Sequence, residues 1–131
     1  MLRASNWLAY RSGLLQMYLA SSSFAGTETR SQLDYAAGTY ARSSPSVVAL
    51  GTLAMLHWDA SEVLGQVNVP VLIITADQDT TTLPRASEHM KQRIPNAQLT
   101  VIHPAAHLGV LERNAEYNRG IAEFAAAQLQ R

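Results

Sequence analysis

The sequence contains no cysteine and carries no net charge, and each of these features excludes classes of function. Without cysteine there is no disulfide framework, no cysteine-ligated zinc and no thiol nucleophile, so the four histidines are the main candidates for metal binding or proton transfer. Ten Lys and Arg balance ten Asp and Glu, so the chain has no broad attraction for nucleic acid or anionic lipid. We therefore expect no nucleic-acid partner and no membrane partner.

Long hydrophobic runs are absent as well. Arg3 followed by the apolar run Leu14–Ala20 loosely imitates a secretory signal, but Gln16 interrupts that run. Arg11, Gln16 and the serines at 21–23 fall inside any window of about 20 residues that could span a bilayer. We expect a soluble cytoplasmic protein, and a cleaved signal peptide is the alternative.

Hydrophobic residues make up 47% of the 131 residues, which is enough for one compact domain. Helical spacing of apolar residues predicts helices over about 4–20, from a cap at Thr27 onward, and over Pro45–Leu56. Asp59 and Glu62 have the spacing of a capping box for one further short turn. These patterns define a helical region over residues 1–66.

The pattern changes to alternating strand and helix over residues 67–131. The apolar, β-branched run Val69–Thr75 is typical of a strand covered on both faces in a parallel sheet, and Leu99–Ile102 forms a second strand. A helix from Pro84 to Ile94 connects them, and an amphipathic helix follows from Asn114. The predicted fold is therefore α/β, with helices followed by a β-α-β-α unit that has two parallel strands.

Candidate chemistry follows both strands, because ligands of α/β sheets gather at the carboxyl ends of the strands. Asp77 and Asp79 follow the first strand, and His103 and His107 follow the second. A carboxylate there can hold an imidazole in one tautomer and stabilise its protonated form. Two alternatives remain: the acids cap a turn beside an ordinary loop histidine, or the four residues bind a metal. Their spacing is not a usual ligand spacing, so we expect no metal and no cofactor.

The chain resembles the α/β-hydrolases. Val69–Asp79 is similar to the family's strand-and-acid segment, v-P-v-l-v-i-x-G-x-x-D, and residues 94–99, 106–107 and 112–114 resemble its final strand, Gly-His loop and last helix. The resemblance implies that Asp79 is the acid and His107 the base of a catalytic triad. It also implies that the upstream helices form a lid, since Phe24–Arg30 and Leu56–Asp59 look like lid sequence of bacterial esterase-like members.

The sequence departs from the family pattern in three places. Ala76 and Ala106 stand where the family usually has glycine, and either alanine would be strained if its position needs a positive φ. None of the seven glycines begins the G-x-S-x-G motif that carries the family's nucleophile. Ser21–Ser23 and Ser43–Ser46 lie at predicted helix ends, where capping is their expected role.

Two functions follow from the resemblance. The first is a truncated, esterase-like hydrolase that has the acid and histidine but needs a nucleophile from another chain or segment, and so is not catalytic alone. The second is a non-enzymatic domain that binds itself or an apolar small molecule. The Val69–Thr75 strand would have a bare apolar edge, which soluble proteins avoid, so we expect a homodimer formed through that edge or through exchanged lid helices.

Overall fold

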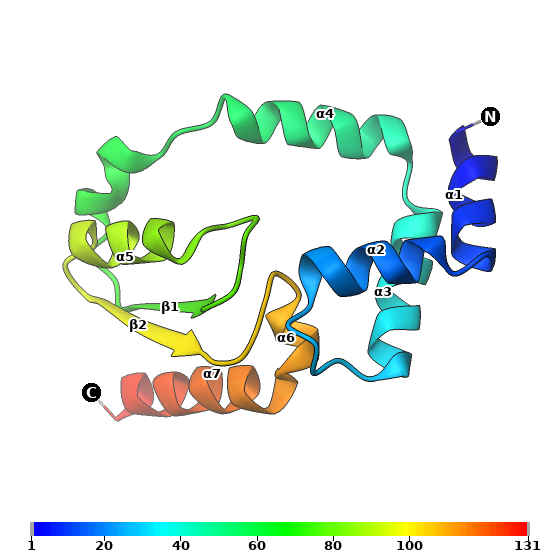
Figure 1. Cartoon of the computed structure of the whole chain (residues 1–131). Coiled ribbons are helices and arrows are strands. Elements are labelled where there is room, and N and C mark those ends of the chain that lie inside the picture. The colour runs from blue at the N-terminus through cyan, green and yellow to red at the C-terminus, as the bar shows by residue number, and fades with distance from the viewer. Residues whose placement is uncertain (1, 131) are drawn as a thin grey trace.

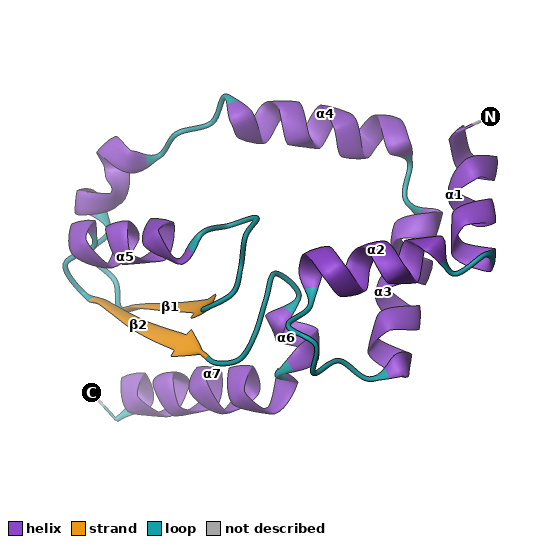
Figure 2. Cartoon of the chain, viewed as in Figure 1, coloured by secondary structure: helices purple, strands orange, loops and turns teal. Residues whose placement is uncertain are grey.

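The computed structural model describes residues 2–130, and the side chains of residues 5–130. Helices occupy the first half of the chain, and two strands follow in the second half (Figures 1 and 2). The elements are α1 (Leu2–Arg11), α2 (Leu14–Ser23), α3 (Arg30–Arg42), α4 (Pro45–Leu56), the 3-10 helix η1 (Ser61–Gln66), β1 (Val71–Ala76), α5 (Pro84–Arg93), β2 (Ala97–Ile102), α6 (Gly109–Glu112) and α7 (Asn114–Leu129).

The two strands pair in parallel, as the sequence predicts, in a register that runs from Val71 opposite Ala97 to Ala76 opposite Ile102. α5 connects them, and both α5 and α7 contact both strands. Figure 1 shows α5 and α7 on opposite sides of the strands. Successive side chains of β1 accordingly enter two different cores: Ile73 packs in the cluster with Ile94, whereas Ile74 packs against the cluster of Ala76 and Ile102.

The predicted single helix over residues 4–20 is wrong, because a sharp break at Gly13 separates α1 from α2. Gly13 has a φ of 83°, in the left-handed region that glycine adopts at no steric cost. The break folds α1 back so that α1, α2 and α3 pack against one another. Their buried core contains Leu15, Leu19, Phe24, Ala36, Ala37 and Ala41.

Two predicted helix starts also need correction. The cap of α3 is Thr29, not Thr27: the Thr29 hydroxyl accepts the Gln32 amide, while the Gln32 side chain accepts the Thr29 amide. Asp59 accepts the amide of Ser61 rather than closing a capping box with Glu62, and the turn is 3-10. The predicted helices that begin at Pro45, Pro84 and Asn114 are confirmed.

α4 is apolar and yet exposed along its whole length. Its side chains include Val47, Leu50 and Leu53, which are 67%, 67% and 54% exposed. The whole chain exposes 9072 Å² of surface, whereas a compact monomer of 14.3 kDa exposes about 6,800 Å². The fold thus leaves more surface, and more apolar surface, open than a compact domain does. None of the helices within residues 2–130 has the length and apolarity needed to cross a bilayer.

Candidate active site

The parallel register brings the candidate site residues to one edge of the sheet. β1 ends at Ala76 and β2 at Ile102, and these two residues are direct neighbours in the ladder. The Asp77 amide donates to the Ile102 carbonyl, 3.1 Å away, and the Gln78 amide donates to the Ala105 carbonyl, 2.9 Å away. The loops after the two strands are therefore hydrogen-bonded to each other at the point where the acids and histidines emerge.

Asp79 and His107 form a direct pair. Nδ1 of His107 lies 3.2 Å from Oδ1 and 3.1 Å from Oδ2 of Asp79. The Asp79 side chain is 8% exposed and that of His107 36% exposed. An ionised carboxylate can only accept hydrogen bonds, so Nδ1 carries the proton, and neutral His107 has its lone pair on Nε2. That nitrogen is thus available to take a proton from a nucleophile.

Asp79 is held in place by the turn that follows it. Its Oδ1 accepts the amides of Thr81 and Thr82, each at 2.8 Å, and its Oδ2 accepts the Thr82 hydroxyl at 2.6 Å. Burial opposes ionisation of Asp79, but the hydrogen bonds from Thr82, His107 and Thr81 outweigh it and lower the pKa of this carboxyl below its ordinary value. Asp79 therefore caps a turn and also contacts His107, so the turn-capping role does not exclude the predicted role as the acid of a triad.

Asp77 and His103 form a second, more exposed pair. Oδ2 of Asp77 accepts a hydrogen bond from Nδ1 of His103, whose side chain is 74% exposed, and Oδ1 accepts the Ala105 amide at 3.1 Å. Burial opposes ionisation of Asp77, but these hydrogen bonds outweigh it and lower its pKa. His103 and His107 are thus each paired with a separate aspartate. Among residues 2–130, no group of three or more His, Asp or Glu side chains is placed to share a metal ion.

The two alanines that replace family glycines are accommodated without strain. No residue other than glycine has a positive φ in the part of the chain that the structure describes. Ala76 and Ala106 are 2% and 5% exposed, so both methyl groups are packed in the interior. The departures at these positions therefore leave the Asp79–His107 geometry intact.

His107 opens into a cavity of about 540 Å³ between the sheet end and the helical region. The lining is apolar or hydroxyl-bearing, and none of its described residues is Asp, Glu, Lys or Arg. The lining residues are Tyr18, Leu19, Ser23, Tyr35, Ala36, Thr39, Tyr40, Ser43, Thr52, Thr81, His107, Leu108 and Leu111. The charge-free lining favours an uncharged ligand beside His107.

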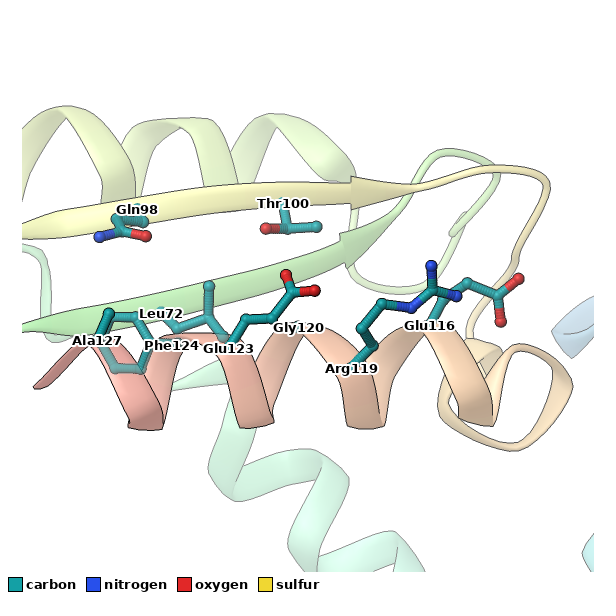
Figure 3. Close-up of a pocket in the computed structure, with 9 residues that line it drawn as sticks. All are labelled: Leu72, Gln98, Thr100, Glu116, Arg119, Gly120, Glu123, Phe124 and Ala127. Carbon is teal, nitrogen blue, oxygen red and sulfur yellow. The ribbon is translucent and has the colours of Figure 1, made fainter. Parts of the chain in front are cut away.

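A second cavity, of about 360 Å³, lies between the sheet and α7. Figure 3 shows Gln98 and Thr100 of β2 facing α7, with Arg119 and Glu123 along the helix. Its lining includes neither Asp79 nor His107. The candidate chemistry therefore lies in the cavity of His107 and not in this one.

Sequence reasoning missed the contribution of Glu112, a buried carboxylate in α6 that is 8% exposed. Only its place in the Glu112–Asn114 motif indicated that this residue matters. Ser23, by contrast, was assigned to capping but lines the His107 cavity, where its hydroxyl lies 3.1 Å from that of Ser22. Of the other two histidines, His57 directly follows α4 as its C-cap residue, and His89 is exposed on α5.

Comparison with known proteins identifies the family. The model of the family described as alpha/beta hydrolase fold matches residues 5–114, so the chain belongs to the α/β-hydrolases. It is 34% identical over 67 residues to a proline iminopeptidase of Thermoplasma volcanium, a match that covers 51% of this chain and 22% of that protein. It is 33% identical over 64 residues to a pimeloyl-[acyl-carrier protein] methyl ester esterase of Neisseria meningitidis, covering 49% of this chain and 20% of that protein.

Solved structures have the same fold. A serine hydrolase involved in carbazole degradation, the CarC enzyme, superposes with a TM-score of 0.66 at 15% identity, covering 86% of this chain and 46% of that one. BpoC of Mycobacterium tuberculosis H37Rv, described as a non-heme bromoperoxidase, superposes with a TM-score of 0.57 at 19% identity, covering 96% of this chain and 51% of that one. The chain thus spans about half the length of these structural relatives and has a partial α/β-hydrolase fold.

Proposed function

We propose that this chain supplies the acid and the base of an esterase-like α/β-hydrolase centre, with Asp79 as the acid and His107 as the base. The observation that carries the proposal is the Asp79–His107 pair at adjacent strand ends, with both oxygens of a buried carboxylate facing Nδ1. The matches to an esterase and a peptidase support hydrolysis of a carboxylic ester or amide. We place the protein in the cytoplasm.

In the proposed reaction, Nε2 of His107 removes the proton from a hydroxyl or water nucleophile as that oxygen bonds to the carbonyl carbon of the substrate. Asp79 stays ionised and stabilises the imidazolium that forms. His107 then returns the proton to the leaving oxygen or nitrogen as the bond to the carbonyl carbon breaks. Where the nucleophile is a hydroxyl, the acyl group is now esterified to it, and a water deprotonated by His107 in the same way cleaves this ester, with the proton returned to the hydroxyl oxygen. Asp79 must be ionised to stabilise the imidazolium of His107, and the lowered pKa of Asp79 supports its ionised form.

The nucleophile in this proposal comes from outside the 131 residues, from another chain or a further segment, because the G-x-S-x-G motif is not in the sequence. In this view the chain is the truncated, C-terminal part of a hydrolase. The helical region over residues 1–66 is the cap domain that covers the cavity, and residues 67–131 are the end of the core. A water molecule activated by His107 is the nucleophile available to the chain alone.

Hydrolysis of p-nitrophenyl acetate tests the role of His107. Exposed imidazoles attack this activated ester weakly, so the matched control is His89→Ala, which removes an exposed histidine on α5. We expect His107→Ala to lower the turnover to the weak level of the remaining exposed imidazoles and His89→Ala to preserve most of it. Equal rates in the two variants would contradict the role of His107 as the base and favour the second candidate.

The second candidate is a non-enzymatic domain that binds a second copy of itself, or an apolar small molecule in the His107 cavity. Its support is the open surface: within residues 2–130 the sheet has two strands, so one edge of β1 carries no strand, and α4 is apolar and exposed. The excess surface, about 2,300 Å² over a compact monomer, exceeds the roughly 800 Å² that one partner buries in a standard interface. A homodimer is compatible with either function.

A further inference from the structure

Glu112, a buried carboxylate outside the Asp79–His107 pair, accepts hydrogen bonds from the segment that joins α2 to α3. Its Oε1 accepts the Ala25 amide at 2.8 Å, the Thr27 amide at 3.1 Å and the Thr27 hydroxyl at 2.8 Å. These partners lie 85 to 87 residues away in the chain. One carboxylate oxygen of Glu112 therefore binds the segment that connects α2 to α3 in the helical region.

The other oxygen of Glu112 holds the histidine loop. Oε2 accepts the amide of Ala106, 3.3 Å away, and Ala106 directly precedes His107. The amide before it, that of Ala105, is held by Asp77 at 3.1 Å. Two carboxylates from different elements thus bind the two consecutive amides that lead into His107. Immediately after His107, the Leu108 amide donates to the Ser23 carbonyl at 2.8 Å, which ties the same loop to α2.

Glu112 is bound by three backbone amides and one hydroxyl. Among residues 5–130, no Lys, Arg or His side chain forms an ion pair with it. A buried carboxylate is costly unless hydrogen bonds replace its water, and bonds to an ionised acceptor are about twice as strong as neutral ones. The Ala25–Thr27 segment and the Ala106 amide thus share one carboxylate, through Oε1 and Oε2 respectively.

We propose that Glu112 is a positioning residue that fixes His107 relative to the helical region, so that displacement of the Ala25–Thr27 segment also displaces His107 from Asp79. The inference rests on the proposed function for its catalytic meaning, since it concerns the base of that site. Glu112 itself touches neither His107 nor the nucleophile position in this account. It acts through the Ala106 amide.

The test changes each end of the connection separately and measures the other end. Thr27→Val removes one hydroxyl donor from the helical side, and Glu112→Gln replaces the carboxylate. The matched controls are Ser12→Ala, which removes an exposed hydroxyl that donates to the Ala9 carbonyl at the end of α1, and Glu123→Gln, which neutralises an exposed carboxylate on α7. The measurements on the full chain are amide hydrogen exchange at Ala25 and Ala106, and the NMR resonances of the His107 ring.

We expect Glu112→Gln to raise the exchange rates of Ala25 and Ala106 by roughly tenfold or more and to shift the His107 ring resonances. Thr27→Val should raise exchange at Ala106 and shift the His107 ring as well, although Thr27 bonds to neither residue. Both controls should leave these signals unchanged. If the effects of Thr27→Val stay within residues 25–27, with Ala106 and His107 unchanged, the inference is overturned, and this result stands even if Glu112→Gln does not fold.

The activity measurement separates this inference from the proposed function. If His107→Ala leaves hydrolysis unchanged while Thr27→Val still moves the His107 resonances, the proposed function fails and the connection stands. If His107→Ala lowers hydrolysis and Thr27→Val leaves exchange at Ala106 unchanged, the proposed function stands and the positioning role fails. Where both hold, Thr27→Val lowers the His107-dependent rate and Ser12→Ala does not.

Discussion

Nδ1 of His107 donates to the carboxylate of Asp79, with the two oxygens 3.2 and 3.1 Å away, although 28 residues separate the pair in the chain. The parallel ladder brings them together, because β1 and β2 end side by side and the loops beyond both strands leave the same edge of the sheet. The pair is therefore a consequence of register, and it persists with alanines at positions 76 and 106.

Asp79→Asn should change how stability depends on acid. The pKa of Asp79 is lower in the folded chain than the ordinary value of 3.8, so this group stabilises the fold at neutral pH, and the contribution is lost as pH falls below that value through the folded pKa. The asparagine variant should be less stable than the parent at pH 7, and the difference should shrink as the pH falls below about 4. Urea unfolding at several pH values measures this. A pH-independent difference would contradict it.

Gly13→Ala should destabilise the break between α1 and α2. A side chain at the observed φ of 83° costs about 1–2 kcal/mol, although the space around the glycine is open. The matched control is Gly51→Ala in the exposed interior of α4, where the space is also open and alanine favours the helix by about 1 kcal/mol. We expect the urea midpoint of unfolding to fall for Gly13→Ala and to rise for Gly51→Ala. A rise for Gly13→Ala would show that the left-handed turn is not required.

Gly109→Ala should disturb the loop that carries His107. The added Cβ would lie 2.8 Å from the Tyr117 hydroxyl oxygen and 3.2 Å from Cβ of Ala105, so one of these neighbours must move. Overpacking of this kind costs about 1–3 kcal/mol. Gly120→Ala is the control, because its Cβ meets Ile74 at an ordinary 3.8 Å. The urea midpoint of unfolding and the hydrolysis rate should both fall for Gly109→Ala and stay unchanged for Gly120→Ala. Equal stability of the two variants would contradict the crowding.

Leu72→Pro should separate the proposed dimer into monomers. The Val71 amide bonds to the Asn96 carbonyl of the β2 side, and alternate amides of a strand point to opposite edges, so the Leu72 amide points to the open edge. Proline there removes an edge donor and leaves the ladder to β2 intact. Sedimentation equilibrium should show a dimer for the parent chain and for Leu72→Ala, and a monomer for Leu72→Pro. A parent monomer at all concentrations would contradict the proposed dimer.

The sequence predicted those features that depend on local residue pattern. The β-branched run that forms β1 and the placement of Asp79 and His107 after the two strands follow from local pattern and general sheet topology. The break at Gly13 was missed because the apolar spacing continues through it, and only the backbone shows the left-handed φ. Glu112 was missed for another reason: its partners Ala25 and Thr27 lie more than 80 residues away, and no local pattern reports a contact over that distance.

A double-mutant cycle on Asp79 and His107 tests the central claim most directly. The rates of p-nitrophenyl acetate hydrolysis are compared for the parent chain, Asp79→Asn, His107→Ala and the variant with both substitutions, each checked for folding by circular dichroism. Residues that act as a unit show losses that do not add. We predict that the double variant is no slower than His107→Ala, because Asp79 acts only through His107. Losses that multiply in the double variant, or a parent rate that does not depend on His107, would contradict it.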